Sequence, residues 1–155
     1  MVERFERFSY AIFEISRYWH KLTTEEMEKY GLKGPHSIYL VVMHRFPDGI
    51  TAPQLCEYCG KDKSDVSRMM SIMEQKGLVT KESVHQNRYG GIFRLTEEGW
   101  KAAEFVCQRA ALAVELAGKD LSEEVRAHLY AGLESIAANL RDLSRDGLPI
   151  ETDKE

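Results

Sequence analysis

The stretch that decides the fold is TAPQLCEYCGKDKSDVSRMMSIMEQKGLV, residues 51–79. Thr51 and Gln54 have the spacing of a capping box, in which each side chain bonds the other residue's backbone N–H. Pro53 falls in the first turn, where a missing backbone N–H costs nothing. Gly60 can adopt the left-handed conformation that ends a helix after about two turns. The first part of the stretch therefore predicts a short capped helix.

A second helix is predicted directly after the first, because Asp62 is a good N-cap and Gly77 a good stop. Its apolar residues follow the i, i+3, i+4, i+7 pattern of a buried helical stripe: Val66, Met69, Met70 and Met73. Small hydroxyls on the other face permit close approach to DNA, and an arginine offers a fork for guanine or phosphate. An ordinary solvated helix face is the alternative, but a short helix and a tight turn before it favour the recognition helix of a helix-turn-helix. The DNA contacts predicted on this helix are Lys63, Ser64, Ser67, Arg68 and Ser71.

A β-hairpin is predicted after the second helix. Residues 78–83 and 92–95 have strand character, and Gly90-Gly91 permits a tight turn between them. A basic hairpin tip beside a recognition helix can reach the minor groove, whose negative potential favours arginine. An ordinary polar hairpin is the alternative. We predict DNA contacts from Asn87 and Arg88 at the tip.

Both ends of the chain carry heptad-patterned apolar residues. In residues 3–22 these are Phe5, Phe8, Ile12, Ile15, Trp19 and Leu22. In residues 122–145 they are Val125, Leu129, Leu133 (or Gly132), Ile136, Leu140 and Leu143. Packing within one chain is one interpretation of these seams. We favour association of the ends of two chains, since helix-turn-helix proteins commonly bind two-fold DNA sites as dimers. A long helix over residues 97–117, capped by Thr96 and ended by Gly118, and an apolar helix over residues 35–46 complete the predicted elements.

Length and charge bound the function. The chain has 155 residues, which suits one domain with helical extensions. Its net charge is −4, yet residues 61–94 hold seven Lys or Arg and four Asp or Glu, so the remainder carries −7. The positive charge is thus concentrated where the DNA-contacting elements are predicted. No segment approaches the length of a membrane span, and the first residues contain acids, unlike a signal peptide. We therefore expect a cytoplasmic protein without membrane contact.

The order of these elements resembles the multiple antibiotic resistance regulator (MarR) family over essentially the whole chain. The residues that carry the resemblance are VSR at 66–68, EQKGLV at 74–79 and LTEEG at 95–99. The resemblance implies a mainly α fold with a small β-wing, in which a winged helix-turn-helix at about residues 35–99 lies between dimerisation helices at residues 1–30 and 97–146. It also implies a homodimer on a pseudo-palindromic operator, usually a repressor, which a small aromatic ligand releases from DNA. The chain departs from the family at the wing, where Asn87 replaces a common aspartate while Arg88 keeps the arginine.

A cluster of aromatic and histidine residues could border a ligand pocket near the dimer helices: Trp19, His20, His36, Tyr39 and His44. We predict ligand contacts from the first four. The alternative is that these residues fill the core, which is common for aromatic residues at helical spacing.

The three cysteines fit a reducing compartment. Cys56 and Cys59 form a C-x-x-C pair, but structural zinc needs four ligands and no second pair exists. No catalytic or phosphate-binding motif is present, so we predict neither an enzyme nor a metal or cofactor site. Two alternatives stay open: a redox- or metal-responsive regulator of the same fold, and a winged-helix module that docks proteins instead of DNA.

Overall fold

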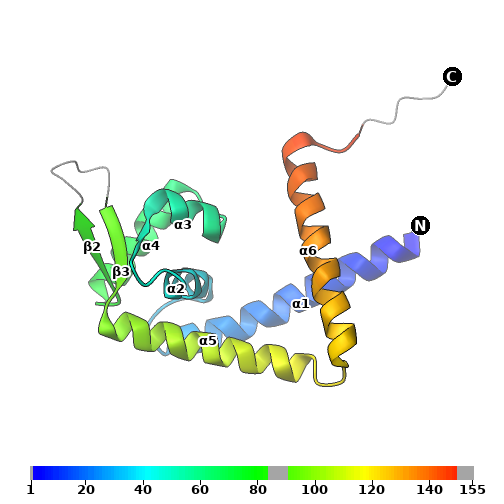
Figure 1. Ribbon diagram of the computed structural model, residues 1–155, viewed down its shortest axis with the longest axis horizontal. Coiled ribbons are helices and arrows are strands. Elements are labelled where there is room, and N and C mark those ends of the chain that lie inside the picture. The colour runs from blue at the N-terminus through cyan, green and yellow to red at the C-terminus, as the bar shows by residue number, and fades with distance from the viewer. Residues whose placement is uncertain (1, 84–90, 150–155) are drawn as a thin grey trace. The chain divides into compact units, whose positions relative to one another are not determined.

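The computed structural model describes residues 2–83 and 91–149 (Figure 1). These residues form six α-helices, one 3₁₀ turn and three short strands. The elements in chain order are α1 (Val2–Glu28), the 3₁₀ turn η1 (Gly34–His36), α2 (Ser37–His44), β1 (Ile50–Thr51), α3 (Ala52–Cys59), α4 (Lys63–Gln75), β2 (Val79–Ser83), β3 (Gly91–Leu95), α5 (Glu97–Ala117) and α6 (Glu123–Asp146). The predicted mainly α fold with a small β-wing is confirmed.

The chain divides into two compact units, Met1–Ala113 and Val114–Glu155, and the boundary falls within α5. The first unit contains α1, the sheet, and α2, α3 and α4. The second unit contains the last turn of α5 and all of α6.

The helix signals at residues 51–79 form as predicted. The Thr51 hydroxyl accepts from the Gln54 N–H and the Gln54 side chain accepts from the Thr51 N–H, which completes the capping box. Gly60 ends α3 with a φ of 62°. The Asp62 carboxylate accepts from the Asp65 N–H at 2.8 Å and caps α4. These local features fix both ends of α3 and the start of α4.

The wing contains one strand that the sequence analysis missed. The sheet order is β1-β3-β2 and both pairings are antiparallel, with Ile50 opposite Phe93 and Val79 opposite Leu95. β1 has only two residues, which is too short to show the alternating pattern that identifies a strand. Its second residue is Thr51, so the same position ends a strand and caps α3. The sheet therefore ties the start of the motif to the base of the wing.

The helix predicted over residues 35–46 is shorter than expected. Pro35 lies in η1, and the α-helix itself runs only over Ser37–His44. The Lys33 N–H donates to Nδ1 of His36 at 3.1 Å, which holds the tight 3₁₀ turn before α2. Sequence periodicity does not separate a 3₁₀ turn from the first turn of an α-helix.

The core of the first unit lies between α2, α3, α4 and the sheet, with contributions from α1 and α5. Its completely buried members include Met27, Tyr39, Leu40, Leu55, Met73, Ala102 and Ala103. Gly99 brings α5 against the start of β2, since a Cβ there would lie 1.9 Å from the Leu78 carbonyl oxygen. The glycine of the LTEEG segment thus has a packing role.

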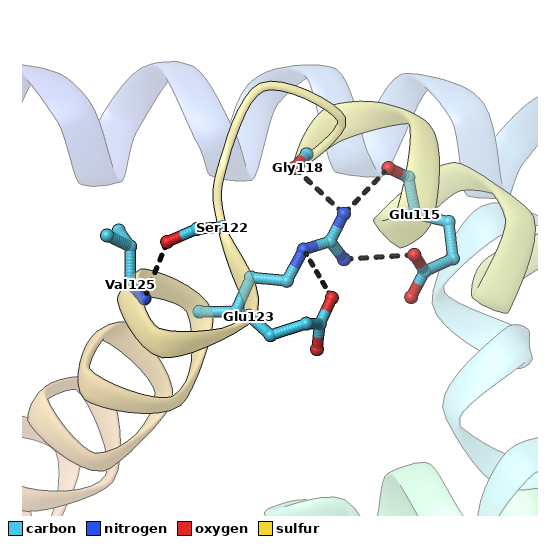
Figure 2. A network of polar contacts seen from close by, with 6 residues as sticks. Glu115, Gly118, Ser122, Glu123 and Val125 are labelled. Atoms are coloured by element: carbon cyan, nitrogen blue, oxygen red, sulfur yellow. Dashed lines mark hydrogen bonds and ion pairs between the residues drawn. The ribbon is translucent and has the colours of Figure 1, made fainter.

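The second unit has a polar corner between the end of α5 and the start of α6 (Figure 2). The Arg126 guanidinium donates to the Gly118 carbonyl at 2.8 Å and to the Glu115 carboxylate at 3.0 Å. It also lies 3.7 Å from the Glu123 carboxylate, and the Arg126 residue is 9% exposed. Because the last carbonyls of a helix have no partner within it, a buried guanidinium is a suitable cap. Arg126 is not among the residues to which the sequence pattern assigns a role.

Candidate nucleic-acid interface

The two faces of α4 differ as the sequence predicts. The apolar stripe is buried: Val66, Met69, Met70 and Met73 are each 3% exposed or less. The predicted DNA contacts on the other face are all exposed: Lys63, Ser64, Ser67, Arg68 and Ser71. The helix therefore presents hydroxyls and two cations to solvent while its methionines anchor it to the core.

A carboxylate that the sequence analysis did not assign lies beside Arg68. Nη2 of Arg68 donates to Oδ1 of Asp65 at 2.5 Å, and the phenol of Tyr39 donates to Oδ2 of Asp65 at 2.8 Å. The Arg68 side chain is 71% exposed and the Asp65 side chain 23% exposed, whereas Tyr39 is completely buried. Asp65 thus joins a buried group of α2 to an exposed group of α4.

The pKa values of this group follow from its hydrogen bonds. The bond from Tyr39, followed by the bond from Arg68, holds the pKa of the Asp65 carboxyl below its usual value. Burial, followed by the bond to Asp65, raises the pKa of Tyr39 far above its usual value. At neutral pH the phenol is therefore a neutral donor and Asp65 a carboxylate. The i, i+3 spacing of Asp65 and Arg68 is visible in the sequence, but Tyr39 lies 26 residues away and no local pattern connects it.

The base of the wing is held by Arg94 on β3. Its Nε donates to the Asp48 carbonyl at 3.1 Å, and its guanidinium also pairs with Glu82 on β2. Lys81 lies over the Phe93 ring, 5.5 Å from the centroid. Asn87 and Arg88, which the sequence predicts at the tip, lie outside the described residues. Arg94 thus joins both strands to the turn before β1.

The aromatic and histidine residues predicted to bind a ligand separate into two groups. Trp19 lines a cavity of about 70 Å³ among α1, α2 and α5. The lining also contains Glu26 and Arg109, which form an ion pair at 3.5 Å. Trp19 and His20 also line an open groove of about 350 Å³ that reaches Lys61. Tyr39 is completely buried and His36 is 8% exposed. The structure brings Trp19 and His20 to these spaces and places His36 and Tyr39 in the packed interior.

Two further aromatic contacts hold the first unit together. His44 lies edge-on to Trp100, with ring centroids 5.1 Å apart, so it packs against α5. Tyr30 meets Phe105 in the same manner, at 6.2 Å.

The cysteines are half-buried thiols. Burial is the largest cause that raises the pKa of Cys59, to about 11, and burial also raises the pKa of Cys107. Because the thiolate is the reactive form, Cys59 has little nucleophilic character at neutral pH. Among residues 2–83 and 91–149 no three His, Cys, Asp or Glu side chains gather as a metal site would require.

None of the helices in the described parts of the chain has the length and apolarity needed to cross a membrane.

The comparisons with known proteins agree with this architecture. Residues 30–88 match the model of the MarR family. No curated protein sequence matches the chain.

Several solved structures share the fold. A MarR transcriptional regulator from Methanosarcina mazei Go1 is 22% identical, with a TM-score of 0.78 over 89% of this chain and 99% of its own. A Listeria monocytogenes protein assigned to the MarR family, complexed with 26mer DNA, is 21% identical, with a TM-score of 0.78 over 92% and 96%. The S. aureus MepR–DNA complex is 20% identical, with a TM-score of 0.76 over 85% and 97%.

The family model covers α2, β1, the two helices of the helix-turn-helix and β2. The shared fold extends over most of the chain. The M. mazei and Listeria proteins are transcriptional regulators by name. Over residues 30–88 the chain is therefore similar to the MarR family, and it shares the winged helix-turn-helix fold of the solved MarR structures.

Proposed function

We propose that this protein is a cytoplasmic, dimeric regulator of transcription that binds double-stranded DNA in a sequence-specific manner and represses until a small ligand releases it. The observation that carries the proposal is α4, whose methionine face is buried while its serine and arginine face is exposed. A helix with small hydroxyls and a guanidinium on one face suits the major groove. The Listeria and S. aureus structures of the same fold are complexes with DNA, which supports this use of the helix.

Dimerisation is supported by exposed apolar side chains on α1 and α6. Phe5 is 69% exposed and Ile15 is 65% exposed, although both belong to the heptad seam of α1. The α6 seam is likewise exposed. Soluble monomers rarely leave such continuous apolar surface uncovered, so we propose that a second copy covers it. Two copies would present two recognition helices to successive major grooves, about 10 base pairs apart.

An effector site is proposed at the cavity beside Trp19. Its lining combines Trp19, Leu22 and Val106 with the ion pair of Glu26 and Arg109. A small apolar or phenolic compound has the chemistry for such a lining. Of the ligand contacts expected from the sequence, Trp19 lines this cavity, whereas His20 lines the open groove that also contains Trp19. His36 and Tyr39 are assigned to packing.

The experiment that tests DNA binding is selection of duplexes from random-sequence DNA by the purified protein, followed by footprinting. We expect enrichment of a pseudo-palindrome roughly two turns long, with strongly salt-dependent affinity. Enrichment of no sequence would refute the proposal. Arg88→Ala is expected to reduce the preference for duplexes with A/T-rich flanks over duplexes with other flanks. The reason is that arginine favours the narrow minor groove of A/T-rich DNA.

The two alternatives have less support. A redox-responsive regulator needs a reactive thiol, and the pKa of Cys59 is raised. A protein-docking module would present aromatic or leucine side chains on the exposed face of α4, where serines and Arg68 lie instead.

A further inference from the structure

We propose that Asp65, anchored by the Tyr39 phenol, is a positioning residue that fixes Arg68 for reading a base and thereby sets the sequence specificity of α4. This inference rests on the proposed function, because it concerns how the recognition helix distinguishes one duplex from another. It assigns a role to a buried hydroxyl and a carboxylate that otherwise have no part in DNA binding.

The geometry connects the core to the exposed face of α4 through one side chain. Tyr39 belongs to α2 and is completely buried. Its hydroxyl holds one oxygen of Asp65 at 2.8 Å, and the other oxygen of Asp65 accepts from Nη2 of Arg68. The Asp65 N–H is itself bound by the Asp62 cap. Asp65 is therefore restrained at both its backbone and its side chain, and Arg68 is bound to a fixed acceptor.

An exposed ion pair of this kind adds little to stability, because solvent screens it. Its effect is instead to orient the Arg68 side chain. An arginine side chain loses rotamer entropy when it is immobilised on DNA, and a side chain that is already oriented loses less. The bond to Asp65 uses one of the five N–H donors of Arg68. The remaining donors can form the two-pronged contact with O6 and N7 of guanine.

The charge of Asp65 also acts on the competing mode of binding. An arginine that reaches a phosphate contributes affinity without sequence information. A carboxylate fixed beside the guanidinium repels the phosphate backbone, so it disfavours that pose relative to the base contact. The carboxylate thus favours contact of Arg68 with a base over contact of Arg68 with a phosphate.

The test uses the full chain and two DNA probes: a duplex that the unaltered protein selects from random DNA, and a scrambled duplex of the same length and composition. The ratio of the two affinities measures specificity. Tyr39→Phe keeps the ring and the charge but removes the hydroxyl. We expect it to lower the specificity ratio roughly 3- to 10-fold, a part of the discrimination that one bidentate base contact supplies, while the affinity for the scrambled duplex is unchanged.

Asp65→Asn removes the carboxylate charge and should act on both probes. We expect it to raise the affinity for the scrambled duplex and lower the specificity ratio. Glu74→Gln is the matched control for charge, since it removes a carboxylate from an exposed position of the same helix. Tyr58→Phe is the matched control for the hydroxyl, since Tyr58 is 49% exposed on α3 and packs against Phe46. Both controls should keep the specificity ratio of the unaltered protein.

A double-mutant cycle separates positioning from a general effect on the fold. If Asp65 and Tyr39 act through Arg68, Tyr39→Phe changes the specificity ratio of the unaltered protein but not that of Arg68→Ala. An equal loss in both backgrounds would overturn the inference.

A measurement without DNA provides the independent readout. NMR relaxation of the Arg68 Nε–H should show an ordered side chain in the unaltered protein and a mobile one in Tyr39→Phe. If a duplex is selected but Tyr39→Phe keeps its full specificity ratio, this inference fails and the proposed function stands. If no duplex is selected, both fail.

Discussion

The apolar stripe of α4 and the apolar seam of α6 have the same helical periodicity but opposite burial. The four residues of the α4 stripe are at most 3% exposed, whereas the α6 seam is 38–51% exposed. The α4 stripe belongs to the buried core of the first unit, but Arg126 is the one residue of α6 that is buried in the described chain. An amphipathic pattern thus shows that a face is to be buried and leaves open which chain buries it.

The largest effect is expected from charges placed in the α6 seam. Leu129→Asp combined with Ile136→Asp would bury unpaired carboxylates in the proposed dimer, at a cost of several kcal/mol each. We expect the variant to sediment as a monomer in analytical ultracentrifugation and to lose the concentration dependence of its melting temperature. Glu134→Asp is the control between the two sites, since it keeps the charge of an exposed residue of the same helix. An unaltered protein that is monomeric at micromolar concentration would contradict the comparison.

The next effect is expected in the buried stripe of α4. Met70→Ala should lower the free energy of unfolding by about 2–5 kcal/mol, because truncation of a buried side chain leaves a cavity. The adjacent Ser71→Ala lies on the exposed face and should change it by no more than about 0.5 kcal/mol. Urea denaturation of both variants measures the difference. Similar losses in the two variants would show that α4 has no distinct buried face.

Arg68→Ala tests whether the exposed face of α4 contributes to DNA binding but not to the stability of the fold. We expect the affinity for the selected duplex to fall by about 1–3 kcal/mol with relaxed preference at one base position. The free energy of unfolding should change by less than about 1 kcal/mol, because the ion pair with Asp65 is exposed. Fluorescence anisotropy and urea denaturation measure the two quantities. A large loss of stability with unchanged DNA affinity would show that Arg68 serves the fold and does not contact DNA.

A smaller effect is expected from pH. Burial, followed by the neighbouring charge of Lys33, lowers the pKa of His36 below its usual value of 6.5. The unfolded chain therefore binds more protons than the folded chain once the pH falls below about 6.5, so the free energy of unfolding decreases as the pH is lowered through that range. Protonation also removes the Nδ1 acceptor that holds the Lys33 N–H.

The pH effect is measured by denaturation at a series of pH values. His36→Gln should flatten the slope below pH 6.5, whereas His128→Gln, on the exposed surface of α6, should keep it. An unchanged slope in His36→Gln would assign the pH dependence to other groups.

The sequence predicted the parts of the fold that local chemistry determines. The caps of α3 and α4, the positive φ of Gly60 and the buried methionines are each set by residues within a few positions of one another. β1 was missed because a two-residue strand has no alternation to detect, and the start of α2 was misplaced because a 3₁₀ turn resembles a helical turn in sequence.

The candidate site was predictable only in part. The exposed serines and Arg68 follow from helical periodicity, but their tie to the core depends on Tyr39, which approaches Asp65 through tertiary packing. The same packing decides that Tyr39 and His36 are interior residues while Trp19 and His20 border open space. The sequence shows that aromatic and histidine residues recur in this part of the chain, but it does not show which of them border a cavity.

The Arg126 corner has a consequence for local unfolding. Because one guanidinium from α6 holds the carbonyls of Glu115 and Gly118 at the end of α5, neither helix end can fray without releasing a buried cation from its acceptors. The last turn of α5 and the first turn of α6 should therefore open as one cooperative unit. In a dilute, undimerised chain, the amides at this corner would exchange with solvent deuterium more slowly than those in the later turns of α6. The corner would then hold the first turn of α6 in place in the monomer, before the proposed dimer forms.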